Sequence, residues 1–401
     1  MRYRILMPAV CLLAAPVLAA WFPLSSGTTT DLEAVCFPVD AATGYAVCGA
    51  HVIKTTDSGA TWDSLPGPSL WTLTAVQFPV DAMTGYVVAS GGKMAKTTDG
   101  GATWARETSG VTLDLRSICF PVDAETGYVS GGDPGEGTML KTTDGGDHWI
   151  HQVANTTQPI EAVCFPVDAQ TGFAAGWEGV LLKTTNGGTD WAPLSSGSTN
   201  TFSSICFPDD ALTGYVAGSS GLVLKTTDGG ATWVPKPTGT FDYLASVHFP
   251  TSDTGYVAGS SGSIFRTTNR GDTWVRQASD TLVFLTSIQF PVDAQTGYAV
   301  GRGGTILKTT DGGAAVEETT TQERTTVRVQ PTVLRSVLLL PEAVGGERLA
   351  VGAHLLDING RKVMELRAGA NDVRGLAPGV YFITEDGAWR AVCAQKVVVT
   401  R

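Results

Sequence analysis

Hydrophobic and polar residues alternate in short stretches along most of this chain, and a turn signal follows each stretch. Residues 202–233 show the pattern. The letters S-S-I-C-F alternate with period two, which predicts a first strand with Ile205 and Phe207 on one face. P-D-D-A-L-T-G then predicts a turn in which the aspartates bond their own backbone and Gly214 takes a positive φ.

The rest of this unit predicts three more strands. Residues 215–217 form the second strand of the pattern, residues 222–227 the third, and Thr232 and Trp233 a short fourth. Glycine-rich turns separate the strands. Four strands joined by tight turns are typical of one propeller blade.

The unit recurs seven times. Its phenylalanine lies at positions 37, 78, 120, 165, 207, 249 and 290, so the intervals are 41, 42, 45, 42, 42 and 41 residues. A β-rich unit repeated about every 40 residues indicates a propeller, and we therefore expect an all-β fold with seven blades. The longest interval contains G-G-D-P-G-E-G, which predicts an acidic loop at residues 133–137 of the third blade.

Each repeat ends in K-T-T-D-G-G-A-T-W or a close variant. We expect the Asp or Asn to accept backbone N–H groups across its turn, and the Trp to fill the space between blades. Asparagine replaces aspartate in two copies, which favours a structural hydrogen bond over proton transfer. The predicted structural residues are Asp57, Trp62, Asp99, Trp104, Asp144, Trp149, Asn186, Trp191, Asp228, Trp233, Asn269, Trp274, Asp311 and Trp21.

Trp21 enters this set because the seventh copy has no tryptophan after Asp311. The stretch W-F-P-L-S-S-G-T-T-T from Trp21 matches W-A-P-L-S-S-G-S-T-N from Trp191. We therefore expect the N-terminal strand to complete the last blade and close the ring.

The T-T-D-x-G-x-T-W pattern resembles the Asp-box, or BNR repeat, of sialidases and sortilin-type receptors. The fuller unit, F-P-V-D-A-x-T-G-Y to K-T-T-D-G-G-A-T-W, is most similar to the repeats of the photosystem II assembly and stability factor family. This resemblance covers about residues 21–313 and implies a seven-bladed propeller. It says little about function, because one fold serves many functions.

The two ends of the chain differ from the repeats. Residues 1–20 combine Arg2 and Arg4 with an apolar run and a small-residue end, which predicts a secretory signal, with a buried N-terminal helix as the alternative. Residues 314–326 predict a polar Thr/Glu-rich linker. Residues 327–401 predict a small β-sandwich with a hairpin turn at Asn359 and Gly360.

The segments L-D-I-N-G-R-K-V, L-A-P-G-V-Y-F and K-V-V-V-T-R of this tail resemble the C-terminal sorting domain of type IX secretion substrates. That resemblance implies delivery through the periplasm to the outer surface or the medium. A generic accessory sandwich is the alternative.

The net charge of the repeats limits the kinds of partner that the chain can bind. Residues 21–326 carry 15 Lys or Arg against 31 Asp or Glu, which argues against nucleic acid as a partner. The Lys or Arg that opens each box is expected either in a basic ring for anionic ligands or, as the favoured alternative, as a solvated or locally paired strand residue. Four cysteines, Cys36, Cys119, Cys164 and Cys206, precede Phe-Pro; they are expected as buried or channel-lining thiols, with a metal site disfavoured by their spacing. Cys36 and Cys48 share one hairpin and could pair.

These observations favour an exported, non-enzymatic binding or scaffold propeller with no cofactor and no catalytic residue. Its expected partners are an unknown protein or cell-surface glycan and, through the tail, the secretion machinery; no transmembrane helix is expected once the signal is removed. The alternative function is a sialidase-like or other glycoside hydrolase. That activity needs an arginine cluster or two suitably spaced carboxylates, and none of the six blade arginines lies in the F-R-I-P context of sialidases.

Overall fold

The structure is a computed structural model that describes residues 21–68 and 71–313. Beyond residue 313 it describes strands β29 to β37 and residues 376–377. The chain divides into two compact units, Met1–Glu317 and Glu318–Arg401. The expected signal at residues 1–20 and the expected linker at residues 314–326 lie outside the described residues.

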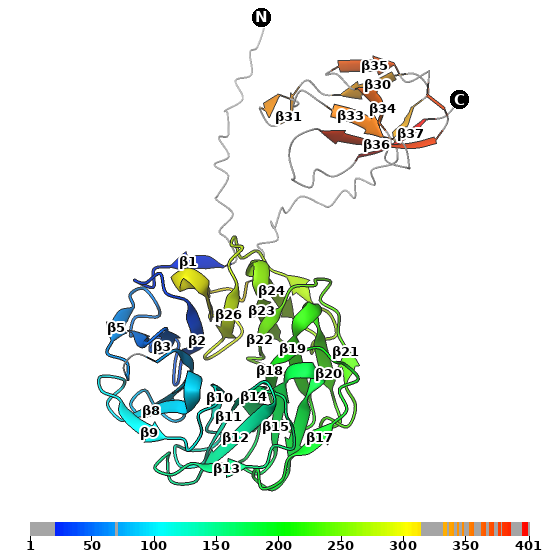
Figure 1. Cartoon of the computed structure of the whole chain (residues 1–401). Coiled ribbons are helices and arrows are strands. Elements are labelled where there is room, and N and C mark those ends of the chain that lie inside the picture. Colours follow the sequence, from blue (N-terminus) through cyan, green and yellow to red (C-terminus); the bar gives the residue numbers. More distant parts are fainter. Residues whose placement is uncertain are drawn as a thin grey trace, which may run out of the picture. The chain divides into compact units, whose positions relative to one another are not determined.

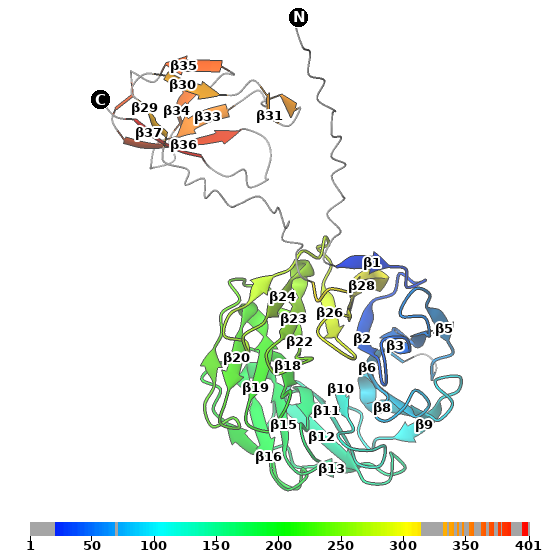
Figure 2. The same ribbon diagram turned by 180° about the vertical axis from the view of Figure 1, so that it is seen from behind.

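The first unit is a seven-bladed β-propeller, as the repeat predicts. Seven antiparallel four-stranded sheets stand around a common centre (Figure 1). The first strand of each sheet is innermost, and the view from behind shows the same ring (Figure 2). Among the described residues, no helix is long and apolar enough to cross a membrane.

The strands keep one order in every blade. The first strands are β2 (Leu32–Cys36), β6 (Leu73–Gln77), β10 (Leu115–Cys119), β14 (Ile160–Cys164), β18 (Phe202–Cys206), β22 (Leu244–His248) and β26 (Leu285–Gln289). The second strands are β3 (Gly44–Cys48), β7 (Gly85–Ala89), β11 (Gly127–Asp133), β15 (Gly172–Gly176), β19 (Gly214–Gly218), β23 (Gly255–Gly259) and β27 (Gly297–Gly301).

The third strands are β4 (His51–Thr55), β8 (Lys93–Thr97), β12 (Glu136–Thr142), β16 (Leu181–Thr184), β20 (Val223–Thr226), β24 (Ile264–Thr267) and β28 (Thr305–Thr309). The outer strands are β5 (Asp63–Leu65), β9 (Ala105–Thr108), β13 (Ile150–Gln152), β17 (Ala192–Leu194), β21 (Val234–Pro235), β25 (Val275–Arg276) and β1 (Phe22–Leu24). Five blades join strands two and three through short 3-10 turns: η1 (Ser90–Gly92), η2 (Trp177–Gly179), η3 (Ser219–Gly221), η4 (Ser260–Gly262) and η5 (Arg302–Gly304).

Two predicted elements differ from the structure. The fourth strand of the fifth blade begins at Val234, after Trp233, because the box turn occupies the residues before it. The expected acidic loop at residues 133–137 is instead the tip of a longer hairpin, in which Asp133 pairs with Glu136. The three extra residues of this repeat therefore extend β11 and β12.

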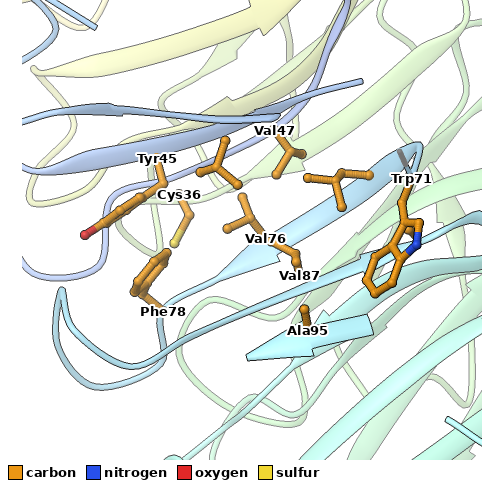
Figure 3. Packing of buried hydrophobic residues seen from close by; sticks show 11 residues of the cluster. Cys36, Tyr45, Val47, Trp71, Val76, Phe78, Val87 and Ala95 are labelled. Carbon is orange, nitrogen blue, oxygen red and sulfur yellow. The ribbon is translucent and has the colours of Figure 1, made fainter. Parts of the chain in front are cut away.

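Neighbouring blades pack through a repeated set of three rings. In the first two blades, Tyr45 stacks on Phe78 with ring centroids 3.8 Å apart, and Trp104 meets Phe78 edge-on at 6.3 Å. Figure 3 shows Tyr45 beside Phe78 within this apolar interface. We call each such set an aromatic triad. The other triads are Tyr86–Phe120–Trp149, Tyr128–Phe165–Trp191, Phe173–Phe207–Trp233, Tyr215–Phe249–Trp274, Tyr256–Phe290–Trp21 and Tyr298–Phe37–Trp62.

The glycine before each Tyr or Phe of the second strand serves this packing. A Cβ on Gly214 would lie 2.3 Å from Cζ of Phe207, so only glycine lets the ring lie flat against the backbone. Gly214 is absent from the residues with positive φ, and the expected positive φ is therefore wrong. A glycine is needed at position 214 because the ring of Phe207 lies against its backbone.

The N-terminal strand β1 lies in the last sheet. Phe22 pairs with Lys308, and the sheet order is β1-β28-β27-β26. Trp21 is fully buried and meets Phe290 edge-on at 5.8 Å, close to the 5.9 Å between Trp191 and Phe165. Trp21 thus occupies the place of the tryptophan that the seventh box lacks.

The second unit contains a five-stranded sheet of order β29-β37-β36-β33-β34 and two strand pairs. The sheet comprises β29 (Thr332–Leu334), β33 (Ala353–Leu356), β34 (Lys362–Glu365), β36 (Gly379–Glu385) and β37 (Gln395–Val399). The pairs are β30 (Val337–Leu340) with β35 (Gly369–Asp372), and β31 (Ala343–Val344) with β32 (Glu347–Arg348). Strands β33 and β34 pair antiparallel around residues 359–360, which lie outside the description. The sandwich stays a prediction.

Deleting residues 21–30 should lower the melting temperature by several degrees, because the deletion removes β1 and Trp21 and exposes the edge of β28. Thermal unfolding followed by circular dichroism measures the shift. A melting temperature equal to that of the intact chain would show that β1 does not hold the last blade.

Candidate functional site

The Asp-box turns form hydrogen-bonded loops at the outer part of each blade. Oδ1 of Asp228 accepts the N–H of Thr232 at 2.9 Å, and Oδ2 accepts its hydroxyl at 2.7 Å. These hydrogen bonds from Thr232 lower the pKa of Asp228 to about 2. Asn269 makes the matching bonds with an uncharged amide: its Oδ1 accepts the N–H of Thr273 at 3.0 Å, and its Nδ2 donates to Oγ1 of Thr273 at 2.9 Å.

A buried threonine inside each box completes the turn. Oγ1 of Thr226 donates to Asp228 at 2.8 Å and accepts the N–H of Gly230 at 2.9 Å. This threonine is present in every copy of the box, but the turn pattern alone does not predict its role. Its equivalents are Thr55, Thr97, Thr142, Thr184, Thr267 and Thr309.

The box lysines do not pair with their own aspartates. Nζ of Lys96 reaches the carbonyl of Gly145 in the next blade at 2.7 Å, and it lies 5.6 Å from the centroid of Tyr86. Tyr86 donates its hydroxyl to the same carbonyl at 2.9 Å. Lysine and tyrosine together tie one blade to the box turn of the next, so these lysines contact the neighbouring box and not their own. Lys54, Lys141, Lys183 and Lys308 make the same kind of contact.

The residue before Phe-Pro links the inner strands. Oε1 of Gln289 accepts the N–H of Phe37 in the next blade at 2.8 Å, and Oε1 of Gln77 accepts that of Phe120 at 2.7 Å. The Cys36 thiol contacts the backbone of Phe78 in the same way, and burial raises its pKa to about 11 (Figure 3). Such thiols are poor nucleophiles.

Cys36 and Cys48 are both free, as are the three other cysteines that the structure describes. In the described part of the chain, no three His, Cys, Asp or Glu side chains gather as a metal site would require. These packing residues therefore build the frame and offer no reactive group.

The blades differ from one another at the second residue of the first strand. All seven first strands carry a β-bulge here, because the register to the second strand shifts between residues one and three. Bulges re-aim side chains. The seven bulge residues, which we call the bulge ring, are Glu33, Thr74, Arg116, Glu161, Ser203, Ala245 and Thr286.

Six members of the bulge ring line a cavity of about 610 Å³. Its other lining residues are Tyr243 and Phe284, which precede β22 and β26, and Ser260 and Arg302, which begin η4 and η5. All of these residues belong to the same end of the inner strands. We call this cavity the channel mouth.

One side of the channel mouth is a closed charge network. Nη1 of Arg116 lies 3.4 Å from Oε1 of Glu161, and its guanidinium also donates to the carbonyl of Gly132. Glu161 accepts the indole N–H of Trp177, whose ring lies 5.7 Å from the Arg116 guanidinium carbon. These contacts hold both charged groups in place.

The other side is more open. Tyr243 and Phe284 meet edge-on at 5.9 Å, and the guanidinium of Arg302 lies 5.2 Å from the Phe284 centroid. Arg302 also lies 3.9 Å from Asp31. Burial, followed by the charge of Asp31, raises the pKa of Glu33 above its usual value.

The comparisons with known proteins concern the repeat and the fold. Residues 194–283 match a family model. That family is described as photosynthesis system II assembly factor YCF48. No curated protein matches the chain.

Two solved structures share the fold. The chain is similar to "YCF48 bound to D1 peptide" at 19% identity, with a TM-score of 0.61, over 76% of this chain and 99% of that chain. It is also similar to YCF48 from Cyanidioschyzon merolae at 20% identity, with a TM-score of 0.60, over 73% of this chain and 98% of that chain. These likenesses show the seven-bladed fold.

The predicted site residues and the channel mouth are separate features. The structure places the Asp-box residues in the turns and the Trp residues in the triads, whereas the channel mouth uses none of them. A signal for the mouth existed in the sequence: the second residue of the first strand varies among E, T, R, S and A, while the flanking positions repeat.

Replacing Trp233 with Ala should cost roughly 3 to 5 kcal/mol of unfolding free energy, because it leaves a large cavity in an aromatic triad. Asp228→Asn should be mild, since Asn269 already makes the matching bonds. Urea unfolding of both variants gives the comparison. Equal losses would mean that the charge of the box aspartate matters more than the packing.

Proposed function

We propose that the protein is a non-enzymatic binding propeller that takes a peptide segment of a protein partner at the channel mouth. The bulge ring is the observation that carries the proposal. Seven blades share one set of packing residues, yet the side chains at the bulge ring differ in charge and size. The bulge ring thus gathers different side chains at one end of the channel, as a specific ligand requires of a repeated frame.

The channel mouth has the size and lining of a ligand site. Its volume of about 610 Å³ lies within the usual range for pockets, and it combines aromatic rings with a few charged groups. The loops that carry Tyr243 and Phe284 also carry Phe241 and Leu282, whose exposed fractions are 92% and 85%. These two side chains offer apolar surface to a partner beside the channel mouth.

The comparisons support a protein partner. The matching family model is described as an assembly factor, and one similar solved structure holds a D1 peptide. Neither is a glycoside hydrolase, so the hydrolase alternative is not favoured. A peptide from an unknown partner protein is therefore the ligand class that we propose.

We further propose that the protein is exported and delivered to the cell surface or the medium. The signal pattern of residues 1–20 and the resemblance of residues 327–401 to a type IX sorting domain support this proposal. In this scheme the tail engages the secretion machinery, and the propeller binds its partner outside the inner membrane.

Peptide binding can be tested with a displayed library of random heptapeptides, selected on the immobilised full-length protein. Peptides enriched on the native chain should bind a Phe241→Ser/Leu282→Ser variant at least about tenfold more weakly, because that variant removes the apolar rim. The matched control is Val122→Ser/Val167→Ser, two exposed apolar residues at the other end of the inner strands. Lack of enrichment, or equal losses in both variants, would overturn the proposed site.

Delivery can be tested by removing residues 327–401 in a host with the type IX apparatus. The truncated chain should stay in the periplasm as a folded propeller, because the tail is a separate compact unit. Cell fractionation and limited proteolysis measure location and folding. Equal amounts of truncated and full-length protein outside the cell would show that the tail is an accessory domain.

A further inference from the structure

Among the charged residues of the channel mouth, three already have partners. Arg116 pairs with Oε1 of Glu161 and donates to the carbonyl of Gly132, and the same glutamate oxygen accepts the indole N–H of Trp177. Arg302 lies over Phe284 and near Asp31. Asp31 in turn accepts the N–H of Gly303 at 2.8 Å.

Glu33 is the exception. Its carboxylate makes no hydrogen bond or ion pair with any residue that the structure describes, although the bulge of β2 directs it to the cavity. Its pKa is raised, first by burial and then by Asp31, while the charge of Arg302 lowers it. Glu33 is exposed within the cavity and has no partner among the described residues, so its carboxylate can accept a charge-assisted bond from a ligand.

We infer that the channel mouth recognises a lysine or arginine side chain of the partner peptide, and that Glu33 forms the ion pair with it. The inference rests on the proposed function and names the chemistry that the site selects. The cation enters beside Tyr243 and Phe284, and apolar residues of the peptide cover Phe241 and Leu282.

Charge complementarity favours a cation over an anion. The mouth and its rim hold three carboxylates, Asp31, Glu33 and Glu161, against two guanidinium groups, which have contacts of their own. An anionic side chain of a peptide would have to lie beside the Glu33 carboxylate, and the two negative charges would repel each other. The surrounding propeller is also acidic, and its field speeds the approach of a positive ligand.

The experiment uses the best binder from the heptapeptide selection and the full-length protein. The peptide is synthesised with its basic residue intact, and again with that residue replaced by methionine or by glutamate. Fluorescence anisotropy then measures the affinity for the native chain, Glu33→Gln and Glu125→Gln. Glu125 is an exposed glutamate at the other end of the inner strands and serves as the matched control.

The basic peptide should lose about tenfold or more in affinity on replacement by methionine, and further affinity with glutamate. Glu33→Gln should bind the basic peptide about as weakly as the native chain binds the methionine peptide, while Glu125→Gln should leave its affinity unchanged. The melting temperature of Glu33→Gln should match that of the native chain, because the side chain lies in the channel and makes no bond.

The two proposals fail in different ways. If selection enriches peptides without a basic residue, or if Glu33→Gln binds as tightly as the native chain, peptide binding at the mouth stands and the role of Glu33 is wrong. Preferred binding of the glutamate peptide would assign recognition to Arg302 and would also overturn the inference. If no peptide is enriched, both proposals fall.

Discussion

The aromatic triad between neighbouring blades is the contact on which the rest of the structure depends. Each blade is a small four-stranded sheet that cannot bury its two faces alone. Stacking of a tyrosine or phenylalanine on the phenylalanine of the next blade joins the two sheets at about 4 Å, and the box tryptophan covers the edge of that pair. The glycine at the start of each second strand is required by the same contact, because a Cβ there would overlap the ring.

Polar ties surround each triad and fix its register. A lysine and a tyrosine reach the carbonyl of the neighbouring box turn, and a Cys, Gln or His links the inner strand to the next phenylalanine. His248 is partly buried in this role, and burial lowers its pKa to about 4, so the neutral ring faces the backbone of Phe290. These contacts repeat around the ring, whereas the side chains of the bulge ring differ from blade to blade.

The sequence predicted the blades well because each blade is defined locally. Period-two alternation, turn residues and the spacing of Phe37 and its equivalents fix the number and order of the strands. It was less informative where the reason lies in another blade, because the carbonyl that Lys96 meets is distant in sequence and the contact between Gly214 and the Phe207 ring serves packing between blades. The channel mouth was missed because Glu33, Arg116 and Glu161 come together only when the blades pack, although variation at the second residue of each first strand marked their positions.

Closure by β1 has a consequence for the order of folding. Blades 1 to 6 are each built from one continuous segment, so they can form and stack in sequence as the chain is synthesised. The last sheet differs, because its outer strand is made first and its other three strands last. Pairing β1 with β28 closes a loop that contains nearly the whole propeller. This pairing is slow because the two strands are far apart in sequence, but its entropy cost rises only slowly with the length of the loop. Pairing of β1 with β28 should therefore slow unfolding of the propeller. Once β1 is paired, every blade has a neighbour on both faces, and no exposed blade remains at which unfolding can begin.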